Sequence, residues 1–191
     1  MKIAIAQINS TIGDFGGNAD KIADAWRRAD EAGAALVVLP ELALCGYPPR
    51  DLLAKPAFLR QNQAALESLA KRGGKAVAVV GYASANETDS GRPARNSAAA
   101  LRDGQVTDVR HKTLLPTYDV FDEDRYFEPA TDNTLVEILG KKVGITICED
   151  IWNDDVFLHD RRYGSRPADE LAAAGAELLL NLSASPGRLG K

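Results

Sequence analysis

The amino-acid sequence predicts an α/β fold. Short, continuous apolar runs such as residues 35–39 are typical of strands that are buried on both faces of a sheet. Segments with apolar residues at helical spacing lie between these runs, and glycine or proline marks most of the boundaries. A strand, a helix and a second strand follow one another at the start of the chain, which is the order of a βαβ unit.

The predicted elements follow from these patterns in order. Strands are predicted at residues 2–8, 35–39, 75–82, 96–101, 106–112, 134–139, 142–147 and 177–182. Helices are predicted from Asn18 to Ala32, from Pro56 to Gly73 and from Pro167 to Gly175. Asparagine is a good N-cap, proline suits the first helical position and glycine commonly ends a helix, so the helices carry start and stop signals.

Two hairpins and one long loop are predicted in the second half of the chain. The pair Asp103-Gly104 marks a tight turn between two of the strands, and Gly140-Lys141 separates the next two. The segment 113–133 between the hairpins is polar, aromatic and interrupted by proline. A connector of this length is uncommon inside a compact domain without a role of its own, so we expect it to be functional.

Composition narrows the class of protein. The chain has 191 residues, 45% of them hydrophobic and 26% charged, which is typical of a single soluble domain over residues 1–191. A net charge of −4 without a basic cluster argues against nucleic acid or an anionic membrane as partner. Two cysteines without a CxxC pair and two isolated histidines predict neither a disulfide framework nor a metal site. The chain has no apolar run that could span a bilayer and begins as a strand, so we predict a cytoplasmic location.

Three residues with complementary chemistry stand at the ends of predicted strands: Glu41, Lys112 and Cys148. Because the carboxyl ends of strands in α/β sheets converge on one crevice, we expect these side chains to meet. A carboxylate can accept the thiol proton, an ammonium can stabilise an oxyanion, and a thiolate can attack a carbonyl carbon. Taken singly, each has a structural alternative: an acid at a helix N-terminus, a solvated surface lysine and a buried core cysteine.

Ordered motifs surround these three residues. They are Leu39-Pro40-Glu41, then His111-Lys112-Thr113-Leu114-Leu115-Pro116, then Ile147-Cys148-Glu149-Asp150. Together they resemble the signature of the nitrilase, or carbon–nitrogen hydrolase, superfamily. More narrowly, the stretches ELALCGYPPRDLL from Glu41, KTLLPTYDVFDEDRYF from Lys112 and NLSASPGRLGK from Asn181 are similar to the glutaminase domain of the glutamine-dependent NAD synthetase family. The resemblance covers residues 1–191.

The resemblance implies a fold and a mechanism. The fold would be an αββα sandwich, in a four-layer αββα-αββα arrangement as two subunits pair, and this chain would hold a C-terminally incomplete part of it. Glu41 would be the general base, Lys112 the oxyanion and orientation group, and Cys148 the nucleophile that forms a thioester with glutamine. Glu123 matches the family's second glutamate beside the lysine and would orient Lys112.

The resemblance also assigns Tyr118, Glu149, Ser185 and Lys191 to the binding of glutamine. A zwitterionic amino acid needs an acceptor for its ammonium and donors for its carboxylate. Glu149 would accept from the ammonium, and Ser185 and Lys191 would donate to the carboxylate. Each of three residues also has a structural alternative. Tyr118 would be an interface aromatic, Ser185 a turn-forming residue before Pro186, and Lys191 a lysine at the chain end. Gly187 stands where the resemblance leads us to expect an aromatic residue.

The resemblance further implies L-glutamine as substrate, a downstream synthetase domain in the same polypeptide and a homo-oligomer. That domain would use the released ammonia to convert deamido-NAD to NAD. No cofactor is expected in this segment; ATP and Mg would serve the synthetase domain, and no GxxxxGK[ST] or SGGxDS-like run occurs here. Two alternatives stay open: a free-standing amidase of the same superfamily acting on another amide, and a catalytically inert scaffold or oligomerisation module.

Overall fold

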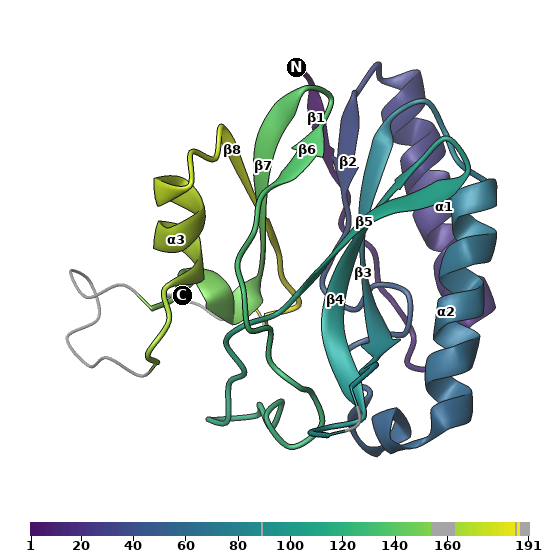
Figure 1. The fold of residues 1–191 in the computed structure, drawn as a ribbon. Coiled ribbons are helices and arrows are strands. Elements are labelled where there is room, and N and C mark those ends of the chain that lie inside the picture. Colours follow the sequence, from purple (N-terminus) through teal and green to yellow (C-terminus); the bar gives the residue numbers. More distant parts are fainter. Residues whose placement is uncertain (89, 154–162, 186, 188–191) are drawn as a thin grey trace.

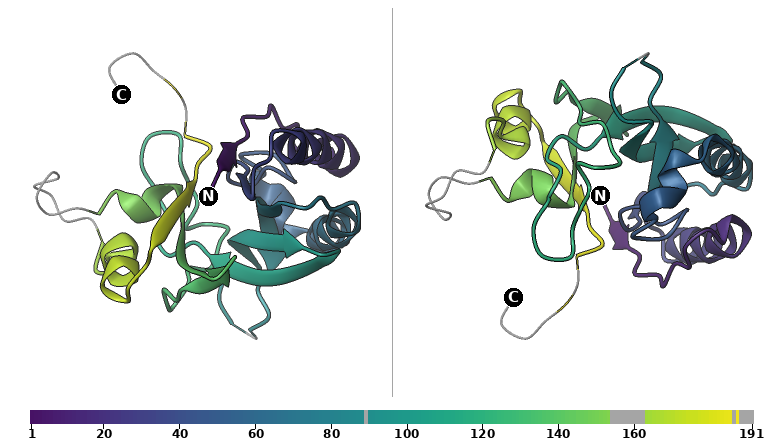
Figure 2. Two further views of the ribbon diagram at one scale, coloured as in Figure 1. Left: turned by 90° about the horizontal axis from the view of Figure 1, so that it is seen from above. Right: turned by 90° about the horizontal axis from the view of Figure 1, so that it is seen from below.

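The computed structural model describes residues 1–88, 90–153, 163–185 and 187. Four layers are stacked in the order helices, sheet, sheet, helix (Figure 1 and Figure 2). Helices α1 (Phe15–Glu31) and α2 (Pro56–Lys71) form one outer layer, and α3 (Pro167–Ala173) lies on the opposite side. The αββα order is therefore confirmed, and a single chain supplies all four layers. The pairing of two subunits stays a prediction.

The larger sheet has five strands in the order β1-β2-β3-β4-β5. Their bounds are β1 (Ile3–Ile5), β2 (Leu36–Val38), β3 (Val77–Ala85), β4 (Ala94–Arg102) and β5 (Gln105–His111). Strands β1, β2 and β3 are parallel, whereas β4 is antiparallel to both of its neighbours. Strand β5 therefore runs in the same direction as β2 and β3. The carboxyl ends of these three strands lie at one edge of the sheet.

The smaller sheet has three strands in the order β6-β7-β8. Their bounds are β6 (Val136–Ile138), β7 (Lys141–Ile147) and β8 (Leu178–Leu182). Strands β6 and β7 form the second predicted hairpin, and β7 pairs in parallel with β8. Two 3-10 helices complete the described elements: η1 (Arg50–Ala54) precedes α2, and η2 (Cys148–Ile151) follows β7 directly.

Two apolar layers hold the stack together. One lies between the helices and the larger sheet and includes Ile22 and Trp26 of α1. The other lies between the two sheets. Because successive side chains of a strand point to opposite faces, Val37 of β2 packs in the first layer, whereas Leu36 and Val38 pack in the second. This double burial explains why β2 is apolar without alternation.

Helix α1 begins before its predicted start. The predicted N-cap was Asn18, but the cap is Asp14, whose Oδ1 accepts the N–H of Gly17 at 2.9 Å. Asn18 is instead fully buried and donates from Nδ2 to the carbonyl of Leu44 at 3.1 Å. It therefore anchors the loop after β2 against the helix. The predicted stop is confirmed, because Gly33 follows the helix with a φ of 70°.

Strand β1 is shorter than the predicted segment 2–8. It pairs with β2, its other edge has no partner strand among the described residues, and Ile5 is 84% exposed. Strand β3 instead continues past its predicted end to Ala85, because it pairs with β4 as far as Ala94. None of the helices within the described ranges has the length and hydropathy to cross a membrane.

Candidate active site

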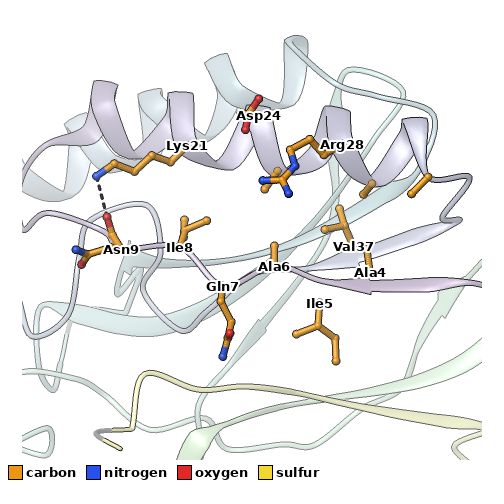
Figure 3. Close-up of a pocket in the computed structure, with 13 residues that line it drawn as sticks. Ala4, Ile5, Ala6, Gln7, Ile8, Asn9, Lys21, Asp24, Arg28 and Val37 are labelled. Carbon is orange, nitrogen blue, oxygen red and sulfur yellow. Dashed lines mark hydrogen bonds between the residues drawn. The ribbon is translucent and has the colours of Figure 1, made fainter.

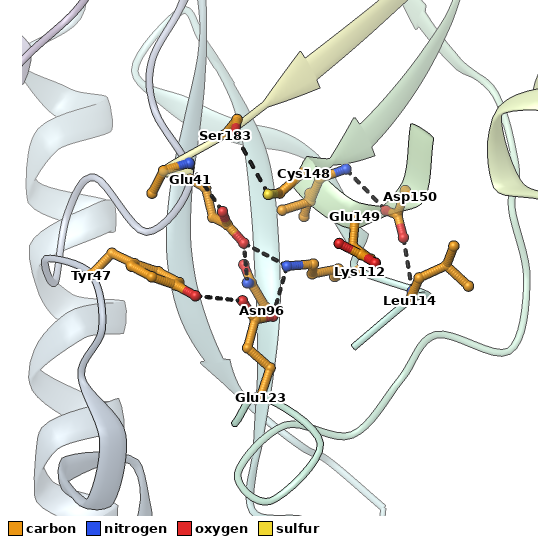
Figure 4. A network of polar contacts seen from close by, with 12 residues as sticks. Glu41, Tyr47, Asn96, Lys112, Leu114, Glu123, Cys148, Glu149, Asp150 and Ser183 are labelled. Atoms are coloured by element: carbon orange, nitrogen blue, oxygen red, sulfur yellow. Dashed lines mark hydrogen bonds and ion pairs between the residues drawn. The ribbon is translucent and has the colours of Figure 1, made fainter. Parts of the chain in front are cut away.

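The structure brings Glu41, Lys112 and Cys148 together (Figure 4). Glu41 follows β2 and Lys112 follows β5, so both lie at the carboxyl edge of the larger sheet. Cys148 follows β7 of the smaller sheet and begins η2. Because the two sheets pack face to face, the cysteine reaches the other two residues from the opposite sheet. The three residues are 2%, 0% and 4% exposed, so the site is buried.

Lys112 lies between two carboxylates. Its Nζ donates to Glu41 Oε1 at 2.8 Å and to Glu123 Oε2 at 2.7 Å. Burial alone would lower the pKa of this ammonium, but the negative charges of Glu41 and Glu123 outweigh burial and raise the pKa. Lys112 is therefore a fixed positive charge inside the site.

Glu123 carries the second carboxylate of this network. Its Oε1 accepts the hydroxyl of Tyr47 at 2.9 Å. Burial raises the pKa of Glu123 to about 7, although Lys112 and Tyr47 act in the opposite direction. Burial also raises the pKa of Tyr47, so its hydroxyl remains a donor. Sequence analysis did not single out Tyr47, although it lies within the stretch after Glu41 that carries the family resemblance.

Cys148 takes an unusual backbone conformation at the start of η2. Its φ of 47° lies in the left-handed region, which residues other than glycine seldom adopt. The hydroxyl of Ser183 donates to its Sγ at 3.5 Å. Burial raises the pKa of Cys148 to about 11 and the charge of Glu41 adds to this, whereas Lys112 and Ser183 act in the opposite direction. The resting cysteine is a neutral thiol, so an attack by sulfur needs a base.

The turn after β2 holds Glu41 against the neighbouring strand. Leu42 has a positive φ of 50°, and the turn lies directly on Gly81 of β3. A Cβ at Gly81 would overlap the carbonyl oxygen of Pro40, so this close approach requires glycine. On its other side Glu41 Oε2 accepts the backbone N–H of Ala184 at 3.1 Å. The turn and the segment after β8 thus fix the carboxylate from two sides.

Asp150 is a buried carboxylate that sequence analysis did not single out. Its Oδ1 accepts the N–H groups of Thr113 at 3.1 Å and Leu114 at 2.8 Å, and its Oδ2 accepts that of Ile147 at 2.9 Å. Burial raises its pKa to about 6, although these backbone donors lower it. The sequence signal that could have identified Asp150 is its position two residues after the candidate nucleophile. Asp150 joins the segment after Lys112 to the end of β7.

Of the residues assigned to glutamine by resemblance, Tyr118 and Glu149 are in contact. Glu149 Oε2 accepts the hydroxyl of Tyr118 at 2.7 Å, and Oε1 accepts that of Tyr163 at 3.0 Å. Glu149 is 4% exposed, although it directly follows the cysteine. A buried carboxylate held by two phenols therefore lies next to the candidate nucleophile. Sequence analysis missed Tyr163, which has no motif of its own.

Of the other two residues assigned to glutamine, the structure describes Ser185 only. Ser185 lies just past Ser183, and its backbone N–H donates to the hydroxyl of Ser183 at 3.2 Å. Lys191 lies outside the described residues. Gly187 is exposed, and a Cβ built there would meet nothing within 4 Å among the described atoms.

Two cavities are relevant to the location of the site. One, of about 620 Å³, lies between β1 and α1, and Lys21 closes one end by donating to the carbonyl of Asn9 at 2.7 Å (Figure 3). Its lining includes none of the three candidate catalytic residues. The other, of about 260 Å³, borders the site because Tyr47 and Glu123 belong to its wall. The described part of the chain contains no cluster of three or more His, Cys, Asp or Glu that could hold a metal ion.

Known sequences are similar to this chain over almost its whole length. The family model described as carbon-nitrogen hydrolase matches residues 2–190. A glutamine-dependent NAD(+) synthetase of Synechocystis is 45% identical over 193 residues, and one of Thermotoga maritima is 41% identical over 194 residues. These matches take in 99% and 100% of this chain but 35% and 31% of those proteins. The chain therefore spans about a third of the length of these curated relatives.

Solved structures share the fold. A glutamine-dependent NAD+ synthetase from Acinetobacter baumannii, in complex with ADP, matches 98% of this chain and 33% of its own, with a TM-score of 0.83 and 34% identity. An amidase from Nesterenkonia sp. matches 99% of this chain and 66% of its own, with a TM-score of 0.75 and 26% identity. With the family model matching almost every residue, this chain belongs to the carbon–nitrogen hydrolase family.

Proposed function

We propose that this chain hydrolyses the side-chain amide of L-glutamine, with Glu41, Lys112 and Cys148 as catalytic residues. The observation that carries the proposal is the buried network in which Lys112 binds both Glu41 and Glu123 beside the thiol of Cys148. Burying three ionisable groups is costly for a fold, so such a cluster beside a nucleophile is a strong indication of chemistry.

The first step is attack by Cys148 on the amide carbon. Because the thiol has a pKa of about 11, its proton must leave as sulfur attacks, and Glu41 accepts that proton. A C–S bond forms and the carbonyl π bond opens to an oxyanion. The ammonium of Lys112 and the backbone N–H of Glu149 stabilise this oxyanion. A single donor of this kind is worth about 3 kcal/mol in comparable sites.

The second half of the reaction restores the enzyme. Glu41 passes the proton to the leaving nitrogen, the C–N bond breaks, and ammonia departs from a thioester on Cys148. Glu41 then takes a proton from water, and the resulting hydroxide adds to the thioester carbon. The C–S bond breaks, glutamate is released, and the proton returns to the sulfur. Lys112 stays charged throughout, since two carboxylates hold its proton.

The substrate's charged groups would be recognised beside the nucleophile. Glu149 is the acceptor for the ammonium of glutamine, and the hydroxyl of Tyr118 orients it at 2.7 Å. Ser185 and Lys191 are proposed as donors for the α-carboxylate, as the family resemblance implies. Glu149 directly follows Cys148 in the chain, which suits a small substrate that carries both the ammonium and the reacting amide.

The wider role is also a proposal. The similar proteins from Synechocystis and Thermotoga maritima are named glutamine-dependent NAD(+) synthetases. We infer that this chain is the glutaminase part of such an enzyme. A synthetase domain further along the same polypeptide, using ATP and Mg, would consume the ammonia to convert deamido-NAD to NAD. The outer edge of β1 has no partner strand among the described residues, and Ile5 there is largely exposed, so we propose that further chain or a second subunit covers it.

The test replaces Cys148 by alanine in the full-length protein. Glutamate release and glutamine-dependent NAD formation should be abolished, while NAD formation from added ammonium continues. Cys45→Ala is the matched control, since Cys45 is equally buried but packs among apolar residues such as Leu42 and Phe58. Undiminished glutamate release from Cys148→Ala would refute the proposal, and so would loss of the ammonium-dependent activity.

A second candidate is a free-standing amidase with another substrate. The likeness to the Nesterenkonia amidase, which extends over 99% of this chain, supports it. The two candidates separate on a panel of amides, because Glu149 and Tyr118 favour a substrate with an ammonium group. Turnover of acetamide at a higher kcat/KM than glutamine would support the second candidate. A folded protein with no turnover of any amide would indicate a scaffold.

A further inference from the structure

We propose that Asn96 is a positioning residue for the general base: it holds the carboxylate of Glu41 in one orientation, so that Oε2 is the oxygen that takes the proton. This inference rests on the proposed function. Asn96 lies in β4, opposite Ala83 of β3, and is 1% exposed. Its Nδ2 donates to Glu41 Oε1 at 2.8 Å (Figure 4).

Asn96 contacts both Glu41 and Lys112. Its side chain binds Glu41, and its backbone carbonyl accepts the N–H of Lys112 at 2.8 Å. Glu41 comes from the turn after β2, and Lys112 from the end of β5. Strand β4 lies beside β5 and is separated from β2 by β3, so Asn96 is well placed to set the distance between these two residues.

Only one end of the Asn96 amide makes a hydrogen bond among the described residues. Its nitrogen must face Glu41, because an amide oxygen there would oppose a carboxylate oxygen. Its Oδ1 then has no hydrogen-bond partner among the described residues, although it is buried. An unsatisfied buried acceptor costs about 1–3 kcal/mol. A small apolar side chain would avoid this cost, so the benefit of the amide lies in its contact with the base.

The two oxygens of Glu41 are consequently unequal. Oε1 accepts both the ammonium of Lys112 and the amide of Asn96, each at 2.8 Å. Oε2 accepts a backbone N–H from Ala184, at the longer distance of 3.1 Å. An oxygen that accepts two strong donors is the poorer proton acceptor. Without Asn96 the carboxylate could turn about its terminal torsion, and the base would lose its fixed direction.

Asn62 offers a matched control. It is also fully buried, and its Oδ1 likewise has no partner among the described residues. Its Nδ2 donates to the carbonyl of Ala83 at 2.7 Å instead of a site carboxylate. Asn62→Ala and Asn96→Ala thus each remove one buried amide with one donated hydrogen bond. They differ in whether the lost bond reaches the base.

The experiment compares both variants in the full-length protein. For Asn96→Ala we expect kcat for glutamine hydrolysis to fall about 100-fold, as for other misplaced catalytic groups, with KM unchanged. The melting temperature should fall in Asn96→Ala and Asn62→Ala alike, because each variant loses one buried hydrogen bond. Asn62→Ala should keep the wild-type kcat. A second variant, Asn96→Ser, retains a polar group for folding, but its hydroxyl is too close to the backbone to reach Glu41, so it should lose kcat equally.

Three results would overturn the inference: wild-type kcat in Asn96→Ala, wild-type kcat in Asn96→Ser, or equal losses of kcat in Asn96→Ala and Asn62→Ala. Failure of the proposed function is distinguishable, because then the wild type itself would not hydrolyse glutamine. The rate of Cys148 alkylation needs no substrate. This alkylation rate should fall in Asn96→Ala, because the carboxylate of Glu41 then lacks one hydrogen-bond donor and its charge raises the pKa of Cys148 further. The rate should stay unchanged in Asn62→Ala.

Discussion

Asp150 accepts the backbone N–H of Leu114 at 2.8 Å, and this contact joins the two sheets at the site. Leu114 lies two residues past Lys112 at the edge of the larger sheet. Asp150 lies two residues past Cys148 in η2, which follows β7 of the smaller sheet. The other carboxylate oxygen of Asp150 accepts the N–H of Ile147, just before the cysteine. One buried carboxylate therefore joins the segment after Lys112 to the residue just before Cys148.

Replacing Asp150 by asparagine should weaken both the fold and the site. Asparagine keeps the volume but turns one acceptor into a donor, so at least one buried N–H loses its partner. We expect a loss of about 1–3 kcal/mol in the free energy of unfolding, measured by urea denaturation, and a lower kcat. Asp169→Asn, on an exposed side chain of α3, is the control and should change neither. Full activity and stability in Asp150→Asn would contradict this role.

Alkylation should distinguish the two cysteines. Burial raises the pKa of Cys45 to about 12, and its sulfur contacts the backbone carbonyls of Leu42 and Gly46. Cys148 has the lower pKa, about 11, and Lys112 lies near it. Iodoacetamide should therefore label Cys148 first, as measured by mass spectrometry of the peptides. Equal labelling of both residues in the folded protein would count against Cys148 as nucleophile.

The pH dependence of that labelling should report the charge of Glu41. The negative carboxylate raises the pKa of Cys148, so neutral glutamine at position 41 removes this contribution. The midpoint of labelling rate against pH should therefore lie lower in Glu41→Gln than in the wild type. Glu67→Gln on the exposed face of α2 should leave the midpoint in place. An upward shift in Glu41→Gln would mean that the two groups do not interact as described.

Lys112 should be as important to stability as to catalysis. Lys112→Met leaves Glu41 and Glu123 buried without their shared counter-charge, and breaking such an arrangement costs about 3–5 kcal/mol. The double variant Lys112→Met/Glu123→Gln has one buried carboxylate fewer and should regain part of this loss. Urea unfolding of the three proteins measures the difference. A double variant no more stable than the single one would contradict the network.

Tyr118 should affect binding more than chemistry. Tyr118→Phe removes the hydroxyl that Glu149 accepts, and loss of a hydrogen bond to a charged group costs about 1.5 kcal/mol. We expect KM for glutamine to rise about tenfold while kcat changes little. Tyr82→Phe, in the core of β3, serves as control. A fall in kcat at constant KM would instead place Tyr118 in the chemical step.

Much of the fold follows from local patterns. The double burial of β2 is visible as an unbroken apolar run. Gly33 marks the end of α1 and Asp103-Gly104 marks the turn between β4 and β5, because the backbone there adopts positive φ. The predicted N-cap of α1 was wrong, because Asp14 and Asn18 are both residue types that cap well and tertiary packing selects between them. The division of the strands into two sheets has no local signal, since the hairpin β6–β7 could extend either sheet.

The site residues likewise divide into those with a local sequence signal and those without one. Glu41, Lys112 and Cys148 can be found because each ends a strand and carries a reactive group. Tyr47 and Asp150 act through contacts with residues far along the chain, such as Tyr47 with Glu123, and a single sequence does not contain those distances. The hydrogen bonds of half-buried Tyr47 and buried Asp150 become visible once the two sheets are placed face to face.

The most direct test of the central claim is to trap the covalent intermediate. The full-length protein would be mixed with glutamine, quenched in acid during turnover and digested, and the peptide that contains Cys148 would be weighed by mass spectrometry. We expect this peptide to gain the mass of glutamine minus ammonia, and the gain to disappear in Cys148→Ala. Turnover of glutamine without an adduct on Cys148, or with the adduct on Cys45, would contradict the account.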